Sequence, residues 1–347
     1  MLKEQSGYVV AILGATGAVG KETLEILEER KFPLASLRLF ASKRSAGEVM
    51  SCQGKEWTVE ELTKESSFAG VDVAFISATD AISREYGQRL GAAGVVVIDD
   101  SGVFRMESDV PLVVPEVNAH ALTTMPRGIV SIPNCTTTPL VMALKPLQDA
   151  VGVKRVVVTT FQSVSGTGAA AMDELMTQTR DLMSFRETKA EVYPYQIAFN
   201  LLPHIGSFND GGDCSEEVKI ARETRKILEA PALRVTATTV RVPVLRCHSE
   251  AINVELGRPL KPNEARAVLA AMPGVIVYDD PVRKLYPMPV DATGKDEVYV
   301  GRIREDESVT NGLNLWVVSD NLRKGAALNA VQIAEHLAQG RWLGGKV

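Results

Sequence analysis

A cysteine stands where a predicted strand gives way to a predicted helix. Cys135 follows the apolar run 128–132 and precedes Pro139, which a first helical turn tolerates, and positions 140–150 continue with helical spacing. Backbone N–H groups and the positive end of the helix dipole favour a thiolate there, and the thiolate is the nucleophilic form of cysteine. The segment therefore indicates a nucleophile, with a small buried hydrophobe as the alternative that it leaves open.

A glycine-rich turn near the start of the chain is the second chemical signal. The apolar run 8–13 ends in Gly14-Ala-Thr-Gly-Ala-Val-Gly20, and a helical pattern follows over 21–30. A strand, a glycine turn and a helix in this order bring a pyrophosphate against a helix N-terminus. We therefore predict a dinucleotide site here, and a tight turn without a ligand is the alternative.

The next predicted strand, 37–41, indicates which dinucleotide binds. An NAD site usually carries an acidic residue at the end of this strand, where it bonds the ribose 2′-hydroxyl. Here the chain continues as Ser42-Lys-Arg-Ser-Ala-Gly47, without a carboxylate. Arg44 can bond a 2′-phosphate through two N–H groups, so the pattern favours NADP, with a solvated basic loop as the alternative.

Strands and helices alternate through the rest of the first third. Predicted strands cover 71–77 and 95–99, and a helical stretch covers 81–92 between them. This alternation is typical of a doubly wound parallel sheet. Arg105 lies just after a strand end, where ligands bind in such sheets, and is a candidate anion ligand; a merely solvated arginine is the alternative.

The pattern changes after the helix that follows Cys135. A β-branched strand covers 154–163, a second glycine-rich turn opens a helix over 169–182, and further strands cover 234–242 and 248–256. The last two are separated by the bend 243–247, which we expect to be a hairpin-like link. We therefore predict a mixed sheet here, of a kind that often presents one face to a partner subunit.

The final predicted helix, 321–337, has a broad face of small apolar residues that we expect to pack back on the first domain, with an N-cap at 319–321. The predicted fold class is α/β. Residues 1–135 with 320–347 would form a Rossmann-type doubly wound NADP-binding domain. Residues 136–319 would form an α+β catalytic and dimerisation domain with a mixed sheet.

The composition excludes several classes of protein. The chain has 347 residues, enough for two cores, and its formal net charge of −5 comes with no basic stripe for nucleic acid or a membrane surface. No apolar run approaches a membrane span, and the polar start does not read as a signal peptide. Four cysteines and four histidines are scattered without metal-ligand spacing. We therefore expect no metal site, no disulfide framework and a reducing cytoplasm.

The motifs together, over essentially the whole chain, resemble the aspartate-β-semialdehyde dehydrogenase family. The segments that carry the resemblance are Gly14–Gly20, Ala41–Gly47, Phe104–Met106, Val113–Asn118, Pro133–Thr136, Gln162–Gly166, Ile197–Asn200, Glu216–Lys219, Arg241–Val244 with His248, and Ser319–Gly325. Two loops depart from the family pattern. Ala78-Thr79-Asp80 stands where many members have a Gly-Gly pair, and Asp100-Ser101-Gly102 stands where many have Asn-Ser-Ser.

The resemblance implies a role for each matching residue. Cys135 would be the nucleophile and His248 the acid/base, with Gln162 beside them, and a homodimer is implied. The substrate residues would be Asn134, Gln162, Glu216 and Arg241, with Arg105 and Lys219 for its phosphate. The NADP contacts would come from Gly14, Thr16, Gly17, Ala18, Val19, Arg44, Ser45, Ser165, Gly166 and Asn321.

The implied reaction is the reversible, NADPH-dependent conversion of L-aspartyl 4-phosphate to L-aspartate 4-semialdehyde through a thioester on Cys135, a step of lysine, threonine and methionine biosynthesis. Covalent catalysis divides one difficult step into two easier ones, and a histidine suits proton transfer near neutral pH. Arg241 could pair the substrate carboxylate and Glu216 its ammonium group. Glu216 and Lys219 are three apart on one predicted helix, so an ordinary surface salt bridge is the alternative for that pair.

Three other readings compete with this one. An N-acetyl-γ-glutamyl-phosphate reductase-like enzyme has similar chemistry on a longer acyl phosphate, and a glyceraldehyde-phosphate dehydrogenase-like enzyme is more distant. Arg241 and Glu216 favour a free amino acid over either. A catalytically silent dinucleotide-binding paralogue would have no need of Cys135, Gln162 and His248 together.

Overall fold

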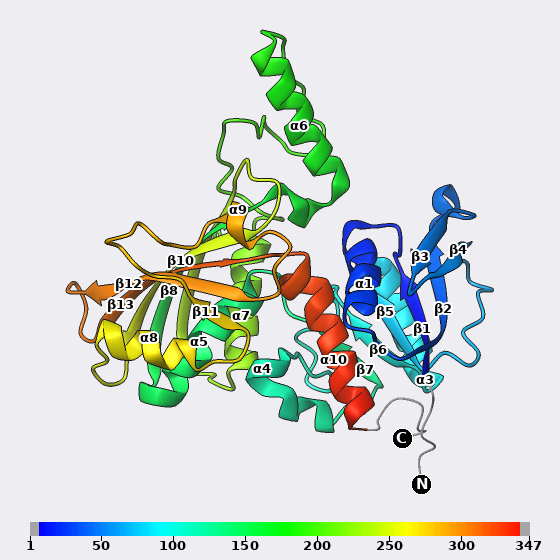
Figure 1. The fold of residues 1–347 in the computed structure, drawn as a ribbon, viewed down its shortest axis with the longest axis horizontal. Coiled ribbons are helices and arrows are strands. Elements are labelled where there is room, and N and C mark those ends of the chain that lie inside the picture. Colours follow the sequence, from blue (N-terminus) through cyan, green and yellow to red (C-terminus); the bar gives the residue numbers. More distant parts are fainter. Residues whose placement is uncertain (1–6, 341–347) are drawn as a thin grey trace. The chain divides into compact units, whose positions relative to one another are not determined.

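The computed structural model describes residues 7–340, and its contacts divide the chain into two units. Unit 1 contains the residues up to Pro133 and those from Ala326 onward, and unit 2 contains Asn134–Gly325. Each unit is described by itself, and Figure 1 shows the elements of both.

Unit 1 is a doubly wound sheet of mostly parallel strands. The order of its strands is β3-β4-β2-β1-β5-β6-β7, and only the β3–β4 pair is antiparallel. Its elements are β1 (Tyr8–Leu13), α1 (Ala18–Glu29), β2 (Leu34–Ala41), η1 (Lys43–Ser45), β3 (Val49–Cys52), β4 (Lys55–Glu61), β5 (Val73–Ile76), α2 (Asp80–Ile82), η2 (Ser83–Gly87), α3 (Gln88–Ala92), β6 (Val96–Asp99), α4 (Pro115–Asn118), η3 (Ala119–Thr123), β7 (Ile129–Ser131) and α10 (Leu328–Gln339). The predicted parallel sheet is confirmed.

Both faces of this sheet are covered, as the alternation along β1 shows. Val10 and Ile12 belong to a core cluster that includes residues of α1 and α10, whereas Ala11 and Leu13 belong to a second cluster with Tyr86 of η2 and Leu90 of α3. A parallel strand buried on both faces reads as a continuous apolar run, which is how residues 8–13 appear in the sequence.

The glycine-rich turn after β1 is tight for a physical reason. Gly14 has a φ of +92°, and a Cβ there would meet the carbonyl oxygen of Ser77 at 2.2 Å. Gly20, in the first turns of α1, would bring a Cβ to 2.3 Å from the carbonyl oxygen of Gly14. Glycine therefore lets the turn adopt its backbone and lets α1 pack closely on it. Because chain order reverses at β1, the turn lies at the topological switch point where such sheets bind ligands.

Unit 2 has a six-stranded mixed sheet in the order β11-β12-β13-β10-β8-β9. Its elements are α5 (Thr137–Val151), β8 (Val153–Gln162), η4 (Val164–Thr167), α6 (Ala169–Met183), α7 (Ser215–Ile227), β9 (Arg234–Arg241), β10 (His248–Leu256), α8 (Pro262–Ala270), β11 (Val275–Val277), α9 (Pro289–Ala292), β12 (Val298–Asp306) and β13 (Gly312–Ser319). Helix α5 packs against the sheet and against α7 and α8 (Figure 1). The predicted mixed sheet is confirmed.

The expected hairpin-like link between β9 and β10 is wrong. β8 lies between them, parallel to β9 and antiparallel to β10. The bend 243–247 therefore crosses the end of β8. Gln162 pairs with Arg241, and His248 with Ser319, so β8, β9 and β13 end where β10 begins, at one edge of the sheet.

The final helix also differs from its predicted form. The segment predicted to be helical from residue 321 begins with the π-helical turn η5 (Arg323–Ala327), and regular α-helix begins at Leu328. Before it, Oδ1 of Asp320 accepts the main-chain N–H of Leu322 at 3.0 Å, as the predicted N-cap region requires. The residues of α10 contribute to the core of unit 1.

Candidate active site

The sulfur of Cys135 lies beside a histidine at the sheet edge of unit 2. Its Sγ is 3.2 Å from Nε2 of His248, although the two residues are 113 apart in the sequence. Cys135 precedes Thr136, the N-cap of α5, and is partly accessible, whereas His248 begins β10 and is buried. A sulfur with an imidazole within hydrogen-bond distance is the arrangement of an activated cysteine nucleophile.

His248 is held on its other nitrogen by Ser163. The main-chain N–H of Ser163 donates to Nδ1 at 3.0 Å, and the Ser163 hydroxyl lies 3.1 Å from the same atom. Burial, and after it the charge of Arg241, lower the pKa of His248 from 6.5 to about 3. The imidazole is therefore neutral across the physiological range.

The loop before Cys135 is anchored to helix α7. The main-chain N–H of Asn134 donates to Oε2 of Glu223 at 2.7 Å, and Nδ2 of Asn134 donates to Oε1 of Glu216 at 2.8 Å. Oδ1 of Asn134 accepts the main-chain N–H of Thr136 at 2.9 Å. Since all three contacts are buried, the position of Cys135 is set by a satisfied polar network.

Glu216 connects two predicted substrate residues with each other. Its Oε1 also accepts Nε2 of Gln162 at 3.0 Å, and its Oε2 is 3.5 Å from Nζ of Lys219. The Glu216 side chain is buried, but that of Lys219 remains 43% exposed. Lys219 can therefore contact a ligand that arrives from solvent. The carboxylate of Glu216 is a fixed hydrogen-bond acceptor inside the site.

Arg241, at the end of β9, is buried close to His248. Its Nη1 donates to the carbonyl oxygen of Ser163 at 2.7 Å, and its Nε is buried without a hydrogen-bond partner among the residues that the structure describes. A buried guanidinium N–H without a partner is costly, and a carboxylate ligand would satisfy it.

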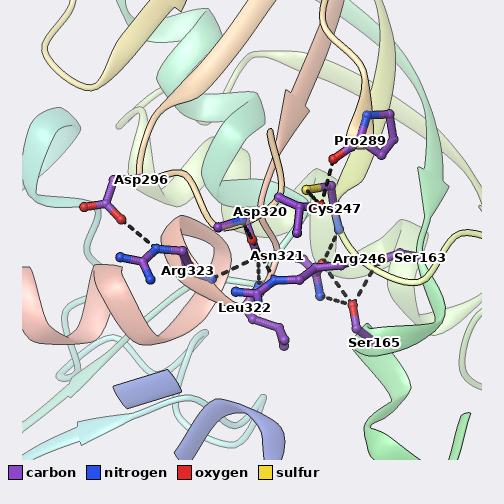
Figure 2. A network of polar contacts seen from close by, with 12 residues as sticks. Ser163, Ser165, Arg246, Cys247, Pro289, Asp296, Asp320, Asn321, Leu322 and Arg323 are labelled. Atoms are coloured by element: carbon purple, nitrogen blue, oxygen red, sulfur yellow. Dashed lines mark hydrogen bonds and ion pairs between the residues drawn. The ribbon is translucent and has the colours of Figure 1, made fainter. Parts of the chain in front are cut away.

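A polar network joins the predicted cofactor residues of unit 2 to the histidine. Oδ1 of Asn321 accepts the hydroxyls of Ser163 and Ser165, each at 3.1 Å, and the main-chain N–H of Cys247 at 3.0 Å (Figure 2). Nδ2 of Asn321 donates to the Ser165 hydroxyl at 3.0 Å. A Cβ on Gly166 would lie 3.2 Å from Nε2 of His248, so glycine leaves room beside the reacting ring.

The other predicted cofactor residues lie in unit 1. The hydroxyl of Thr16, in the turn with Gly14, donates to that of Ser45 at 3.3 Å, which joins the turn after β1 to the segment after β2. Gly17 is the N-cap of α1, followed by Ala18 and Val19, and that first turn has no side-chain cap and no acidic residue. Arg44 is exposed in η1.

This arrangement fits NADP. The uncapped N–H groups at the start of α1 suit a pyrophosphate, and a cation without a neighbouring carboxylate in η1 suits a 2′-phosphate.

Arg105 lies in unit 1, and Lys219 lies in unit 2. Arg105 is buried, its Nη2 donates to the carbonyl oxygen of Asp100 at 2.7 Å, and it is 3.8 Å from the Asp100 carboxylate. Asp100 belongs to a loop that departs from the family pattern. A carboxylate at this distance reduces the positive electrostatic potential around Arg105 and so weakens its attraction for an anion.

Sequence reasoning missed several residues around the site. Ser163 and Glu223 were not singled out, because an isolated serine and a helical glutamate carry no local signal. Glu250, two residues after His248, is buried with neither carboxylate oxygen hydrogen-bonded among the described residues, and burial raises its pKa well above 4.5. A Cβ on Gly325 would lie 3.1 Å from Cβ of Cys135, so this glycine lets the chain pass against the nucleophile.

Residues 7–340 contain neither a candidate metal centre nor a candidate membrane span. No group of His, Cys, Asp and Glu there could hold a metal ion. No helix in that range is long and apolar enough to cross a membrane.

Comparison with known proteins points to one family. A family model described as semialdehyde dehydrogenase, NAD binding domain, matches residues 9–125, and one described as semialdehyde dehydrogenase, dimerisation domain, matches residues 144–324. Aspartate-semialdehyde dehydrogenase of Aquifex aeolicus is 52% identical over 96% of this chain and 98% of its own.

Two solved structures are also similar to this chain. Aspartate semialdehyde dehydrogenase II of Vibrio cholerae, complexed with ASA, has a TM-score of 0.94 at 44% identity, over 96% of this chain and 99% of its own. The Candida albicans enzyme, solved with NADP, has a TM-score of 0.74 at 28% identity, over 96% and 99%.

Proposed function

Because this chain belongs to the semialdehyde dehydrogenase family, we propose that it is an aspartate-semialdehyde dehydrogenase. It interconverts L-aspartyl 4-phosphate and L-aspartate 4-semialdehyde with NADPH or NADP⁺, through a thioester on Cys135. The observation that carries the proposal is the 3.2 Å contact between Sγ of Cys135 and Nε2 of His248. The similar enzymes of known name support the substrate and the cofactor.

In the oxidative direction the thiolate of Cys135 attacks the aldehyde carbon, and a thiohemiacetal forms. Bound NADP⁺ supplies the hydride acceptor at this point, and NADPH the donor in the reverse direction. Phosphate then attacks the thioester, the C–S bond breaks, and the acyl phosphate leaves a free Cys135. Covalent attachment holds the acyl group in place between the two steps.

The substrate roles follow from charge and burial. Arg241 pairs the α-carboxylate through its unpartnered Nε, and the fixed carboxylate of Glu216 takes the α-ammonium group. Gln162 and Asn134 hold Glu216 in place by hydrogen bonds to one of its oxygens. Lys219 and Arg105 bind the phosphate. An acetylated amine would leave the Glu216 carboxylate without a cation, so an N-acetylated substrate is disfavoured.

We assign NADP contacts to residues within each unit. In unit 1 the N-terminus of α1 and its turn hold the pyrophosphate, through Gly14, Thr16, Gly17, Ala18 and Val19. Arg44 and Ser45 hold the 2′-phosphate. In unit 2, Ser165, Gly166 and Asn321 are next to the His248 network and contact the nicotinamide half.

The assembly is proposed to be a homodimer, because a dimerisation-domain model matches residues 144–324. We place the protein in the cytoplasm. Its cysteines within residues 7–340 are all free, as is typical of proteins in a reducing compartment.

The test compares substrates and a cysteine variant. The purified protein should oxidise aspartate semialdehyde with NADP⁺ only when phosphate or arsenate is present, and should prefer it to N-acetylglutamate semialdehyde. Cys135→Ala should abolish turnover and keep NADP⁺ binding, whereas Cys52→Ala, which removes a buried thiol of unit 1, should keep both. Turnover by Cys135→Ala would contradict the mechanism, and preference for the acetylated aldehyde would overturn the substrate assignment.

A further inference from the structure

A half-buried tyrosine that has no role in the chemistry described so far lies against the buried arginine of the site. Cζ of Arg241 is 6.0 Å from the centre of the Tyr193 ring. An aromatic face attracts a guanidinium at this distance, and the attraction is stronger where water is excluded. Because Arg241 is only 5% exposed, few water molecules compete with the ring for its guanidinium.

The hydroxyl of Tyr193 holds the ring at its other end. Its O–H donates to Oγ1 of Thr167 at 2.9 Å. Burial raises the pKa of Tyr193 from 10, and the charge of Arg241 offsets this rise only in part, so the hydroxyl keeps its proton near neutral pH. Thr167 is the last residue of η4. A Cβ on Gly166, in the same turn, would lie 3.1 Å from Nη1 of Arg241. Tyr193 therefore contacts both the arginine and the turn that passes beside it.

Helix α6 holds the main chain on both sides of Tyr193. Oε2 of Glu174 accepts two main-chain N–H groups just before the tyrosine, those of positions 191 and 192. Oε1 of Gln178, one turn further along α6, accepts two after it, those of positions 197 and 198, at 2.9 and 3.1 Å. Both α6 side chains are buried. The place of the ring is therefore set by a regular helix and not by a free loop.

The same segment continues to the main chain of Arg241. The N–H of Leu202 donates to the carbonyl oxygen of Arg241 at 3.0 Å, and the N–H of Arg241 donates to that of Leu202 at 2.8 Å. We call residues 191–202 the α6 strap; it includes Ile197–Asn200, a motif of the family resemblance without an assigned role. Through Leu202 and Tyr193 the strap contacts both the main chain and the side chain of Arg241.

We propose that Tyr193 is a positioning residue that holds the Arg241 guanidinium in the orientation that receives the α-carboxylate of the substrate, and so favours aldehydes that carry this carboxylate. The inference rests on the proposed role of Arg241. Within residues 7–340 the Arg241 side chain has one hydrogen bond, from Nη1 to the carbonyl oxygen of Ser163. One bond does not fix the plane of a guanidinium, and paired N–H donors must lie in the plane of the carboxylate that they bind. The Tyr193 ring supplies the second constraint.

Three variants of the full-length protein separate the ring from its hydroxyl. Tyr193→Leu removes the aromatic face, and kcat/KM for aspartate semialdehyde should fall about tenfold to thirtyfold. Tyr193→Phe keeps the face and loses only the bond to Thr167, so the fall should be less than about fivefold. Tyr195→Leu, on the same strap at a position 68% exposed, is the matched control and should stay near wild type. Equal losses in Tyr193→Leu and Tyr193→Phe would overturn the proposal.

A second substrate tests the dependence on the carboxylate. The aldehyde 3-aminopropanal is aspartate semialdehyde without its α-carboxylate, so Arg241 has nothing to pair in it. Wild type and Tyr193→Leu should oxidise it with kcat/KM values within about threefold of each other. A loss of the same size with both aldehydes would make Tyr193 a merely structural residue, against the proposal.

A spectrum of the resting protein tests the contact without any substrate. The Nε–H signal of Arg241 is the one lost from the ¹H–¹⁵N spectrum of arginine-labelled protein in Arg241→Lys. The ring current of Tyr193 acts on this signal, so it should keep its position in Tyr193→Phe and move in Tyr193→Leu. An unchanged signal in Tyr193→Leu would contradict the proposal. A wrong substrate assignment would appear instead as wild-type protein that does not oxidise aspartate semialdehyde, and it would leave the spectrum as expected.

Discussion

The main-chain nitrogen of Asn134 lies 2.7 Å from Oε2 of Glu223, a residue 89 positions later in the chain. The side chain of the same asparagine bonds Glu216, seven residues before Glu223 and so on the same face of α7. Helix α7 therefore holds the nucleophile loop through two buried carboxylates. One of them is also the proposed ligand of the substrate ammonium group, so one helix positions both the sulfur and its target.

Removal of the Glu223 carboxylate should loosen that loop. Glu223→Ala leaves the buried N–H of Asn134 without this acceptor, and we expect a loss of stability of about 1–3 kcal/mol together with a lower kcat. Glu223→Gln keeps an oxygen in place and should lose less stability and less of its kcat. Urea unfolding and initial rates measure the two effects. If Glu223→Ala matched Glu223→Gln in both, the hydrogen bond would not be what orders the loop.

Glu216→Gln should act on the amino-acid substrate. The amide retains an oxygen for Asn134 but loses the charge that pairs the substrate ammonium group. KM for aspartate semialdehyde should therefore rise by about tenfold to a hundredfold, since hydrogen bonds to charged groups contribute about 1.5–3 kcal/mol. KM for phosphate should stay near its original value. Equal increases for both substrates would remove the assignment.

Lys219→Ala should act on phosphate instead. The side chain is 43% exposed and its salt bridge with Glu216 is 3.5 Å long, so its loss should change stability by less than about 1 kcal/mol. KM for phosphate should rise several-fold at constant KM for the semialdehyde. Steady-state kinetics with each substrate varied in turn, beside a thermal melt, separates the two. A lower Tm with unchanged phosphate kinetics would make Lys219 a structural residue.

Arg44→Ala should weaken the preference for NADP⁺. We expect KM for NADP⁺ to rise about tenfold or more while KM for NAD⁺ changes little, because only NADP⁺ carries the 2′-phosphate. Lys43→Ala, the exposed neighbour in η1, is the matched control and should have a smaller effect. An equal increase for both dinucleotides in Arg44→Ala would exclude a 2′-phosphate contact.

Glu250 should make the protein less stable as pH rises. Its folded pKa lies well above 4.5, so above about pH 4.5 the unfolded chain releases a proton that the folded chain keeps. The stability that this group contributes at low pH is lost as pH rises through the folded pKa, by about 1.4 kcal/mol per unit of difference. Glu250→Gln should remove this slope.

The measurement is the thermal midpoint of wild type and Glu250→Gln from pH 5 to pH 9. The contribution of His248 has the opposite sign and is confined to pH values below about 6.5, so it cancels in the difference between the two proteins. Parallel curves for the two proteins would mean that the Glu250 carboxyl ionises normally in the fold.

Local patterns in the sequence were enough to predict the elements that carry chemistry. The apolar run of β1, the glycines that follow it and the helical spacing of α1 are all within about 25 residues, and each constrains its neighbours directly. The same holds for Cys135, whose place before α5 follows from Pro139 and the periodicity after it. The absence of a carboxylate after β2 is likewise visible in the sequence without knowledge of the fold.

Strand order could not be read in this way. The bend 243–247 looks like a hairpin because its flanking strands are adjacent in sequence, but β8 pairs with both of them and separates them. The order of strands in a sheet depends on contacts between segments far apart in the chain, and no local periodicity records them.

The sequence by itself determined which chemical groups the protein has and at which element ends they stand. Only the tertiary structure decided which groups meet. It brings His248 to Cys135 across 113 residues and places the N–H of Ser163 on the far side of the imidazole ring. Every residue except proline has such an N–H, so the residue type at position 163 does not predict this contact. The antiparallel pairing of β8 with β10 places this N–H within hydrogen-bond distance of Nδ1, on the side of the ring away from the sulfur.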